Sequence, residues 1–178
     1  MMNSRHLGAV AALAAVAVGL VFAPLGAQST VSDADRDFAA TAAEANNGEL
    51  VLAKMALGKT NEPSVRLLAS RMLADHTKAG AQLSSITTSE GIKLPASTEL
   101  LPQDQQTRQM LSSLNSHPFD VAYVNSQITA HNAAISLFQK EAQSGSDAAL
   151  KQFAASTLPT LQAHLKYAQQ ALQQVAPQ

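Results

Sequence analysis

Four ionisable residues interrupt stripes of apolar residues in this sequence: Glu49, His76, His131 and His164. Each stripe repeats at alternating steps of three and four, which is the spacing of the buried face of a bundled helix. Three neutral imidazoles and one carboxylate form a competent ligand set for a divalent first-row metal, here Zn, Fe, Ni or Cu. We therefore predict that these four residues hold one metal ion inside a helical bundle.

The four side chains must also reach one level of the bundle. At ~1.5 Å of rise per residue, all four fall in the middle third of helices about 40 Å long, although Glu49 and His76 differ by about 10 Å in height. The placement of His164 depends on phase, because a second stripe puts it at the edge of the apolar face. That second stripe is Leu158, Leu161, Leu165, Ala168, Leu172 and Val175. The candidate hydrogen-bond partners of a ligating imidazole are Asp75, Asp120, Tyr123 and Thr157, of which only Asp75 is adjacent in sequence to a candidate ligand.

The same residues fit a second interpretation. A buried network of Glu and His side chains can specify helix register with no ion present. The protein would then be a non-enzymatic structural or interaction protein. Metal content separates the two hypotheses.

Helical periodicity extends over four long segments, and composition agrees: Ala and Leu are abundant and aromatics are only 4 %. The predicted helices cover residues 33–57, 63–90, 119–144 and 147–175, with Pro159 inside the last. Residues 92–118 are too long for a tight hairpin and suit a crossover along the bundle, with a short extra helix over 104–114. We predict an all-α, ferritin-like four-helix bundle over residues 28–178.

The first residues are typical of a secretory signal over 1–27. Arg5 precedes an apolar stretch of 16 residues (7–22), and Ala27 ends a candidate cleavage region. The stretch is shorter than the roughly 20 residues of a membrane-spanning helix. We therefore expect an exported protein that is periplasmic or secreted, with no membrane span in the mature chain. The alternative is an uncleaved N-terminal anchor.

Composition and motifs exclude several functions. The net charge is −1 and no Lys or Arg run occurs, so nucleic-acid binding has no electrostatic basis. The chain has no Cys, which excludes thiol catalysis and disulfides. No phosphate-binding loop, Gly-x-Ser-x-Gly or His-Glu-x-x-His motif is present, and no residue stands out as catalytic. The sequence names no protein partner.

Four segments resemble the exported bacterial family known as domain of unknown function 4142, which is considered ferritin-like. They are NGELVLAKMAL (47–57), PSVRLLASRMLADHTKA (63–79), FDVAYVNSQITAHNAAISLF (119–138) and STLPTLQAHLKYAQ (156–169). The family pattern falls on Glu49, Asp75-His76, His131 and His164, and it implies no established activity. No Glu is followed three residues later by His, so a ferritin-type di-iron site is not expected.

Overall fold

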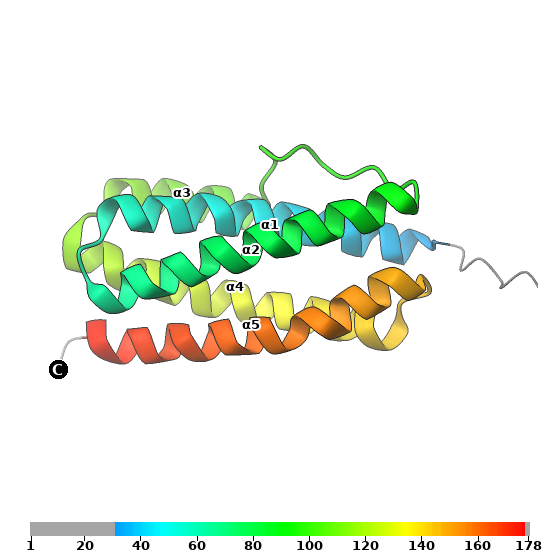
Figure 1. Ribbon diagram of the computed structural model, residues 1–178. Coiled ribbons are helices and arrows are strands. Elements are labelled where there is room, and N and C mark those ends of the chain that lie inside the picture. The colour runs from blue at the N-terminus through cyan, green and yellow to red at the C-terminus, as the bar shows by residue number, and fades with distance from the viewer. Residues whose placement is uncertain (1–30, 177–178) are drawn as a thin grey trace, which may run out of the picture.

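The computed structural model describes residues 31–176, which form five helices and no strand. The helices are α1 (Asp33–Lys59), α2 (Pro63–Ser89), α3 (Pro102–Ser113), α4 (Ser116–Ser144) and α5 (Ala148–Val175). Figure 1 shows α1, α2, α4 and α5 as four long rods packed side by side, with the short α3 alongside. The all-α bundle with a helix inside its crossover is therefore confirmed. The signal expected over residues 1–27 lies outside the described residues.

Helix starts follow the capping residues in the sequence. Ser32 caps α1, and the Asp35 carboxylate accepts a hydrogen bond from the Ser32 backbone N–H, which completes a capping box. The Asp147 side chain accepts from the Leu150 N–H at the start of α5. Asp35 also accepts from the Ser146 N–H, which fastens the turn between α4 and α5 to the start of α1.

Several helix boundaries differ by one to three residues from the sequence-based prediction, and two of these differences have a structural reason. α4 begins at Ser116 rather than near Phe119, because Pro118 fits within a first turn, where backbone N–H groups have no intrahelical partner. α1 continues past Gly58 to Lys59, whose ammonium donates to the carbonyls of Leu111, Ser112 and Leu114. That contact holds the end of α3 against α1. α5 is continuous through Pro159.

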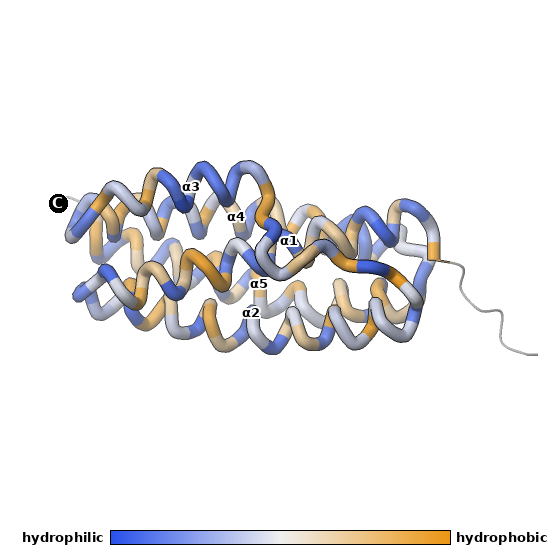
Figure 2. Tube along the Cα trace, turned by 90° about the horizontal axis from the view of Figure 1, so that it is seen from above, coloured by the Kyte–Doolittle hydropathy of each residue, from blue (hydrophilic) through white to orange (hydrophobic). Residues whose placement is uncertain are grey.

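The apolar core is divided into two clusters, one toward each end of the bundle. The first includes Leu52, Met72, Phe119, Tyr123, Ala168 and Val175. The second includes Phe38, Leu83, Phe138, Phe153 and Leu161. Each long helix passes from one cluster to the other, and Figure 2 shows hydrophobic positions recurring along all four. The change occurs around Glu49, His76, His131 and His164, so all four residues lie in the middle part of the bundle, between the two clusters.

The structure also shows which face of α5 is buried. His164 is 2 % exposed and shares its buried face with Leu161, Ala168 and Ala171. The alternative stripe, with His164 at its edge, is therefore wrong. None of the helices within residues 31–176 is long and apolar enough to cross a membrane.

Candidate metal centre

Three histidines from three helices meet in the middle of the bundle. His76 of α2, His131 of α4 and His164 of α5 each offer one ring nitrogen within 4.8 Å of the other two. Their ring centroids are separated by 5.2–5.8 Å, and the residues are 9 %, 1 % and 2 % exposed. The structure thus brings together three of the four residues that the sequence singled out.

The outward nitrogen of each ring lies against an oxygen. His131 Nδ1 is 2.9 Å from the Gln127 carbonyl, His164 Nε2 is 2.8 Å from Asp75 Oδ2, and His76 Nδ1 is 3.1 Å from Asn46 Oδ1. A carbonyl or carboxylate oxygen only accepts, so each outward nitrogen carries the hydrogen and donates. In the neutral rings the lone pairs are therefore on the inward nitrogens, which is the tautomer that ligates metal.

The inward nitrogens have the spacing of metal ligands. His131 Nε2 and His164 Nδ1 are 3.2 Å apart, and His76 Nε2 is buried with no hydrogen-bond partner. Two nitrogens bound at about 2.0–2.1 Å to one tetrahedral metal lie roughly 3.3 Å apart. Since the widest separation is at most 4.8 Å, closure onto an ion requires a side-chain shift of about 1.5 Å or less. The residues present fit a transition metal.

Burial keeps the three rings neutral. It lowers the pKa of His131 to about 4 and that of His76 well below its usual 6.5, where the neighbouring histidines add to the effect. Burial also lowers the pKa of His164, although the hydrogen bond to Asp75 opposes the shift. Neutral imidazole is the ligating form, so the rings are prepared to bind a cation at pH 7.

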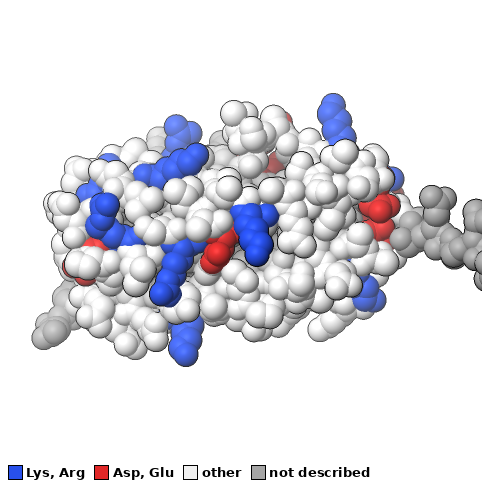
Figure 3. Space-filling view, in the orientation of Figure 1, with Lys and Arg blue, Asp and Glu red and all other residues white. Residues whose placement is uncertain are grey.

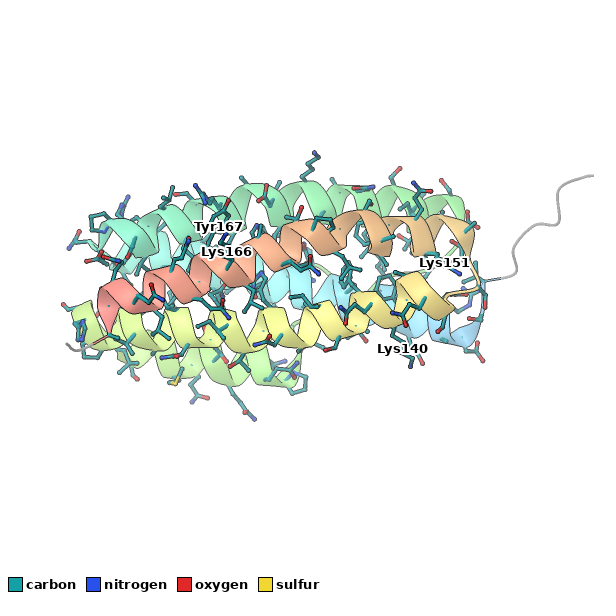
Figure 4. The ribbon with its side chains drawn as sticks, turned by 90° about the horizontal axis from the view of Figure 1, so that it is seen from below. Lys140, Lys151, Lys166 and Tyr167 are labelled. Carbon is teal, nitrogen blue, oxygen red and sulfur yellow. The ribbon has the colours of Figure 1, made fainter. Side chains whose placement is uncertain are left out.

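Positively charged side chains lie on the surface beside His164. The Arg71 guanidinium stacks over the Tyr167 ring, 4.0 Å from its centroid, and Arg71 further disfavours the charged form of His164. Figure 3 shows that Lys and Arg dominate the charged side chains on the face where α2 and α5 lie in front. In Figure 4, Lys166 and Tyr167 project from α5 on its side toward α2.

Glu49 lies next to the three histidines but outside their group. Its Oε1 atom is 4.0 Å from His131 Nδ1, which is the outward nitrogen already bonded to Gln127. Burial raises the pKa of Glu49 to about 7. The nearby Gln127 amide opposes that rise, at a geometry short of a hydrogen bond. In this arrangement Glu49 faces the outer side of the His131 ring.

The partners of the outward nitrogens were only partly predicted. Asp75 was expected as an acceptor because it precedes His76, yet it contacts His164 on another helix, since successive helical residues point about 100° apart. Asp120, Tyr123 and Thr157, which were also candidates, make no hydrogen bond to the three histidines. Asn46 and Gln127 were missed. A signal existed for both: Gln127 is one turn before His131, and Asn46 is one turn before Glu49.

A cavity of about 560 Å³ reaches the centre from the side of α1, α3 and α4. Its lining includes exposed Gln103, Met110 and Thr129 as well as buried His76 and His131. The centre therefore has a route to the surface.

Solved structures show that this fold recurs. A DUF305 fragment from Deinococcus radiodurans superposes with a TM-score of 0.70 at 14 % identity, covering 81 % of this chain and 98 % of that one. CopM in its Cu(II)-bound form gives 0.67 at 16 % identity, with 79 % and 96 % covered. CopM in its Cu(I)-bound form gives 0.67 at 17 % identity, with 80 % and 98 % covered.

Sequence comparison identifies the family. No curated protein sequence matches the chain. The model of a family described as "Domain of unknown function (DUF4142)" matches residues 22–171, which include all five helices except the last few residues of α5. The three-histidine centre thus lies within the matched region, and the chain belongs to the DUF4142 family.

Proposed function

We propose that the protein binds one copper ion through His76 Nε2, His131 Nε2 and His164 Nδ1. One observation carries this proposal: three buried inward nitrogens converge while each outward nitrogen is held by an oxygen acceptor. Lone pairs aimed at one point inside the bundle repel one another unless a cation lies between them. The lowered pKa values make a proton a poor occupant at neutral pH.

Two arguments favour copper among Zn, Fe, Ni and Cu. A site of neutral nitrogen donors binds Cu²⁺ more tightly than the other divalent first-row ions, as the general affinity order predicts. In addition, the CopM structures of similar fold are described as copper-bound. The burial of the ligands suits metal handling, in which an ion is held rather than exposed to reactants. With the signal expected over residues 1–27, we place this role in the cell envelope or outside the cell.

A network without an ion is the second candidate, and the same hydrogen bonds favour it. Asn46 links α1 to His76 of α2, and Asp75 links α2 to His164 of α5. Such contacts between buried polar groups can specify how helices pair. On this alternative the histidines affect stability only, and the purified protein contains no metal.

Elemental analysis of protein purified without chelator or immobilised-metal resin distinguishes the two. We expect about one copper per chain after exposure to Cu²⁺ in excess Zn²⁺. A variant combining His76→Gln, His131→Gln and His164→Gln should stay helical by circular dichroism and bind none. His117→Gln is the matched control, because His117 is exposed at the start of α4. Wild-type protein that takes up no copper, zinc, nickel or iron would contradict the proposal.

A further inference from the structure

Oxygen-bearing side chains form a second polar cluster beside the three histidines. We define this oxygen cluster as Glu49 of α1, Asp104 of α3, and Tyr123 and Gln127 of α4. Tyr123, Gln127 and His131 follow one another at intervals of four residues and so lie along one face of α4. The Gln127 backbone carbonyl accepts from His131, while its side chain lies near Glu49. One residue thus connects the two groups.

The buried members of this cluster have unused polar atoms. Glu49 Oε2, the Tyr123 hydroxyl and both side-chain amide atoms of Gln127 are buried without a hydrogen-bond partner. Tyr123 and Gln127 are 0 % exposed and Glu49 is 7 % exposed. Native proteins pair nearly all such atoms with protein, water or a ligand. The cluster therefore has the chemistry of a site that takes a polar or charged guest.

The half-buried Asp104 extends this cluster toward the surface. A Cβ atom at position 48 would lie 2.5 Å from Asp104 Oδ2, so the absence of a side chain at Gly48 lets α3 bring this carboxylate down onto α1. Glu49 and Asp104 repel each other electrostatically, and this repulsion adds to burial in raising the pKa of Asp104 to about 6. A cation between the two carboxyl groups would relieve that repulsion.

Both carboxyl groups line the cavity that leads to the histidines. Its lining includes Asp104 and Glu49 together with His76 and His131. Most of the remaining lining is apolar, and a divalent ion crosses apolar surroundings only at a large desolvation cost unless negative groups compensate. Oxygen donors bind copper more weakly than imidazoles, so an ion that stops at the carboxylates would still move on to the nitrogens.

We propose that Glu49 and Asp104, with the Gln127 side chain beside Glu49, form an uptake site that receives a hydrated divalent metal ion through the cavity and passes it to the three histidines. This proposal rests on the proposed function, because it requires the histidines to be the destination. It assigns Glu49 to the path of the ion rather than to its final coordination.

The test separates the rate of loading from the final affinity. Full-length protein is mixed with Cu²⁺ in a stopped-flow instrument and copper binding is followed by its visible absorption. Affinity is measured separately by competition with a chelator. We expect Glu49→Gln and Asp104→Asn each to slow loading roughly tenfold or more, the scale of electrostatic focusing in a charged cleft. Stoichiometry and affinity should stay within twofold of wild type. Asp37→Asn, which removes one exposed charge outside this cavity, should load at the wild-type rate.

Each alternative outcome has a distinct meaning. Wild-type loading rates in both variants, with copper still bound by the histidines, would overturn the uptake site and leave the proposed function intact. A loss of affinity in Glu49→Gln as large as in a single histidine variant would make Glu49 a ligand and overturn its uptake role. Failure of wild-type protein to bind copper would remove the proposed function and this inference together. Asp104 is only half-buried, so its variant remains informative if Glu49→Gln fails to fold.

Discussion

His131 Nε2 and His164 Nδ1 face each other at 3.2 Å across the bundle, and neither carries the hydrogen of its neutral ring. The Gln127 carbonyl and the Asp75 carboxylate determine this, because each accepts from the opposite nitrogen of the same ring. The pair is thus preset for a cation, and this state depends on the residues that accept from the outward nitrogens.

Removing the acceptor of His164 should weaken the centre. In Asp75→Ala the ring loses the partner that selects its tautomer and orientation, although no ligand is changed. We expect copper affinity to fall about 10- to 100-fold, the usual cost of losing such a partner. Competition titration with a chromophoric chelator measures the change. Asp33→Ala, which removes an exposed acid at the first residue of α1, serves as the charge control. Unchanged affinity would show that Asp75 does not position the ring.

Copper should be retained at lower pH than in an ordinary histidine site. The pKa of His131 is about 4 in the folded protein, against a usual 6.5, and the pKa values of His76 and His164 are also lowered. Protons therefore compete weakly for His131 until the pH approaches 4, and they compete for the other two rings only below the usual 6.5. Affinity should stay nearly constant as the pH falls from 7 through 6.5 and should decline only at lower pH. A decline that already begins near pH 6.5 would contradict the burial of the rings.

Glu49 should destabilise the metal-free protein at alkaline pH. Its folded pKa of about 7 is raised above the usual 4.5, so the folded state favours the protonated carboxyl. The resulting stability is complete below pH 4.5 and is lost as the pH rises through 7. The free energy of unfolding of Glu49→Gln should therefore exceed that of wild type by an amount on the order of 2 to 3 kcal/mol at pH 8, and by little at pH 4.5.

Urea unfolding of both proteins at the two pH values checks this prediction. The comparison cancels the titration of the histidines, which is common to both chains. An advantage of Glu49→Gln that is the same at pH 4.5 and pH 8 would mean that the carboxylate charge is not the cause.

Two glycines on the long helices should respond differently to alanine. A Cβ at position 80 would lie 2.6 Å from Asn46 Nδ2, whereas a Cβ at position 58 meets nothing within 4 Å. Gly58→Ala should stabilise the protein by about 0.5–1 kcal/mol through helix propensity alone. Gly80→Ala should gain less stability than Gly58→Ala. It should also bind copper several-fold more weakly, because the added methyl group pushes Asn46 away from His76. Thermal unfolding and chelator competition on both variants measure the contrast. Equal copper affinity in the two variants would show that Asn46 does not orient His76.

The sequence could predict the fold because the signals that define each helix lie within that helix or at its ends. Apolar residues at steps of three and four define which face of each helix is buried, and caps such as Ser32 and Asp147 set helix starts. The long segment before α4 predicted a crossover with its own helix. The start of α4 at Ser116 was missed because proline is compatible with both a helix boundary and a first turn.

By itself, the sequence determined that the apolar stripe of each long helix carries one ionisable residue in the middle third of the bundle, with Glu49 and His76 differing by about 10 Å in height. Only the tertiary structure decided which of them converge, which nitrogen each ring turns inward, and that Asp75 serves His164 rather than the adjacent His76. The physical reason is that ring orientation and tautomer depend on acceptors from other helices and from the preceding turn. Helical periodicity specifies the buried face of one helix, whereas these contacts depend on how four helices are rotated and staggered against one another.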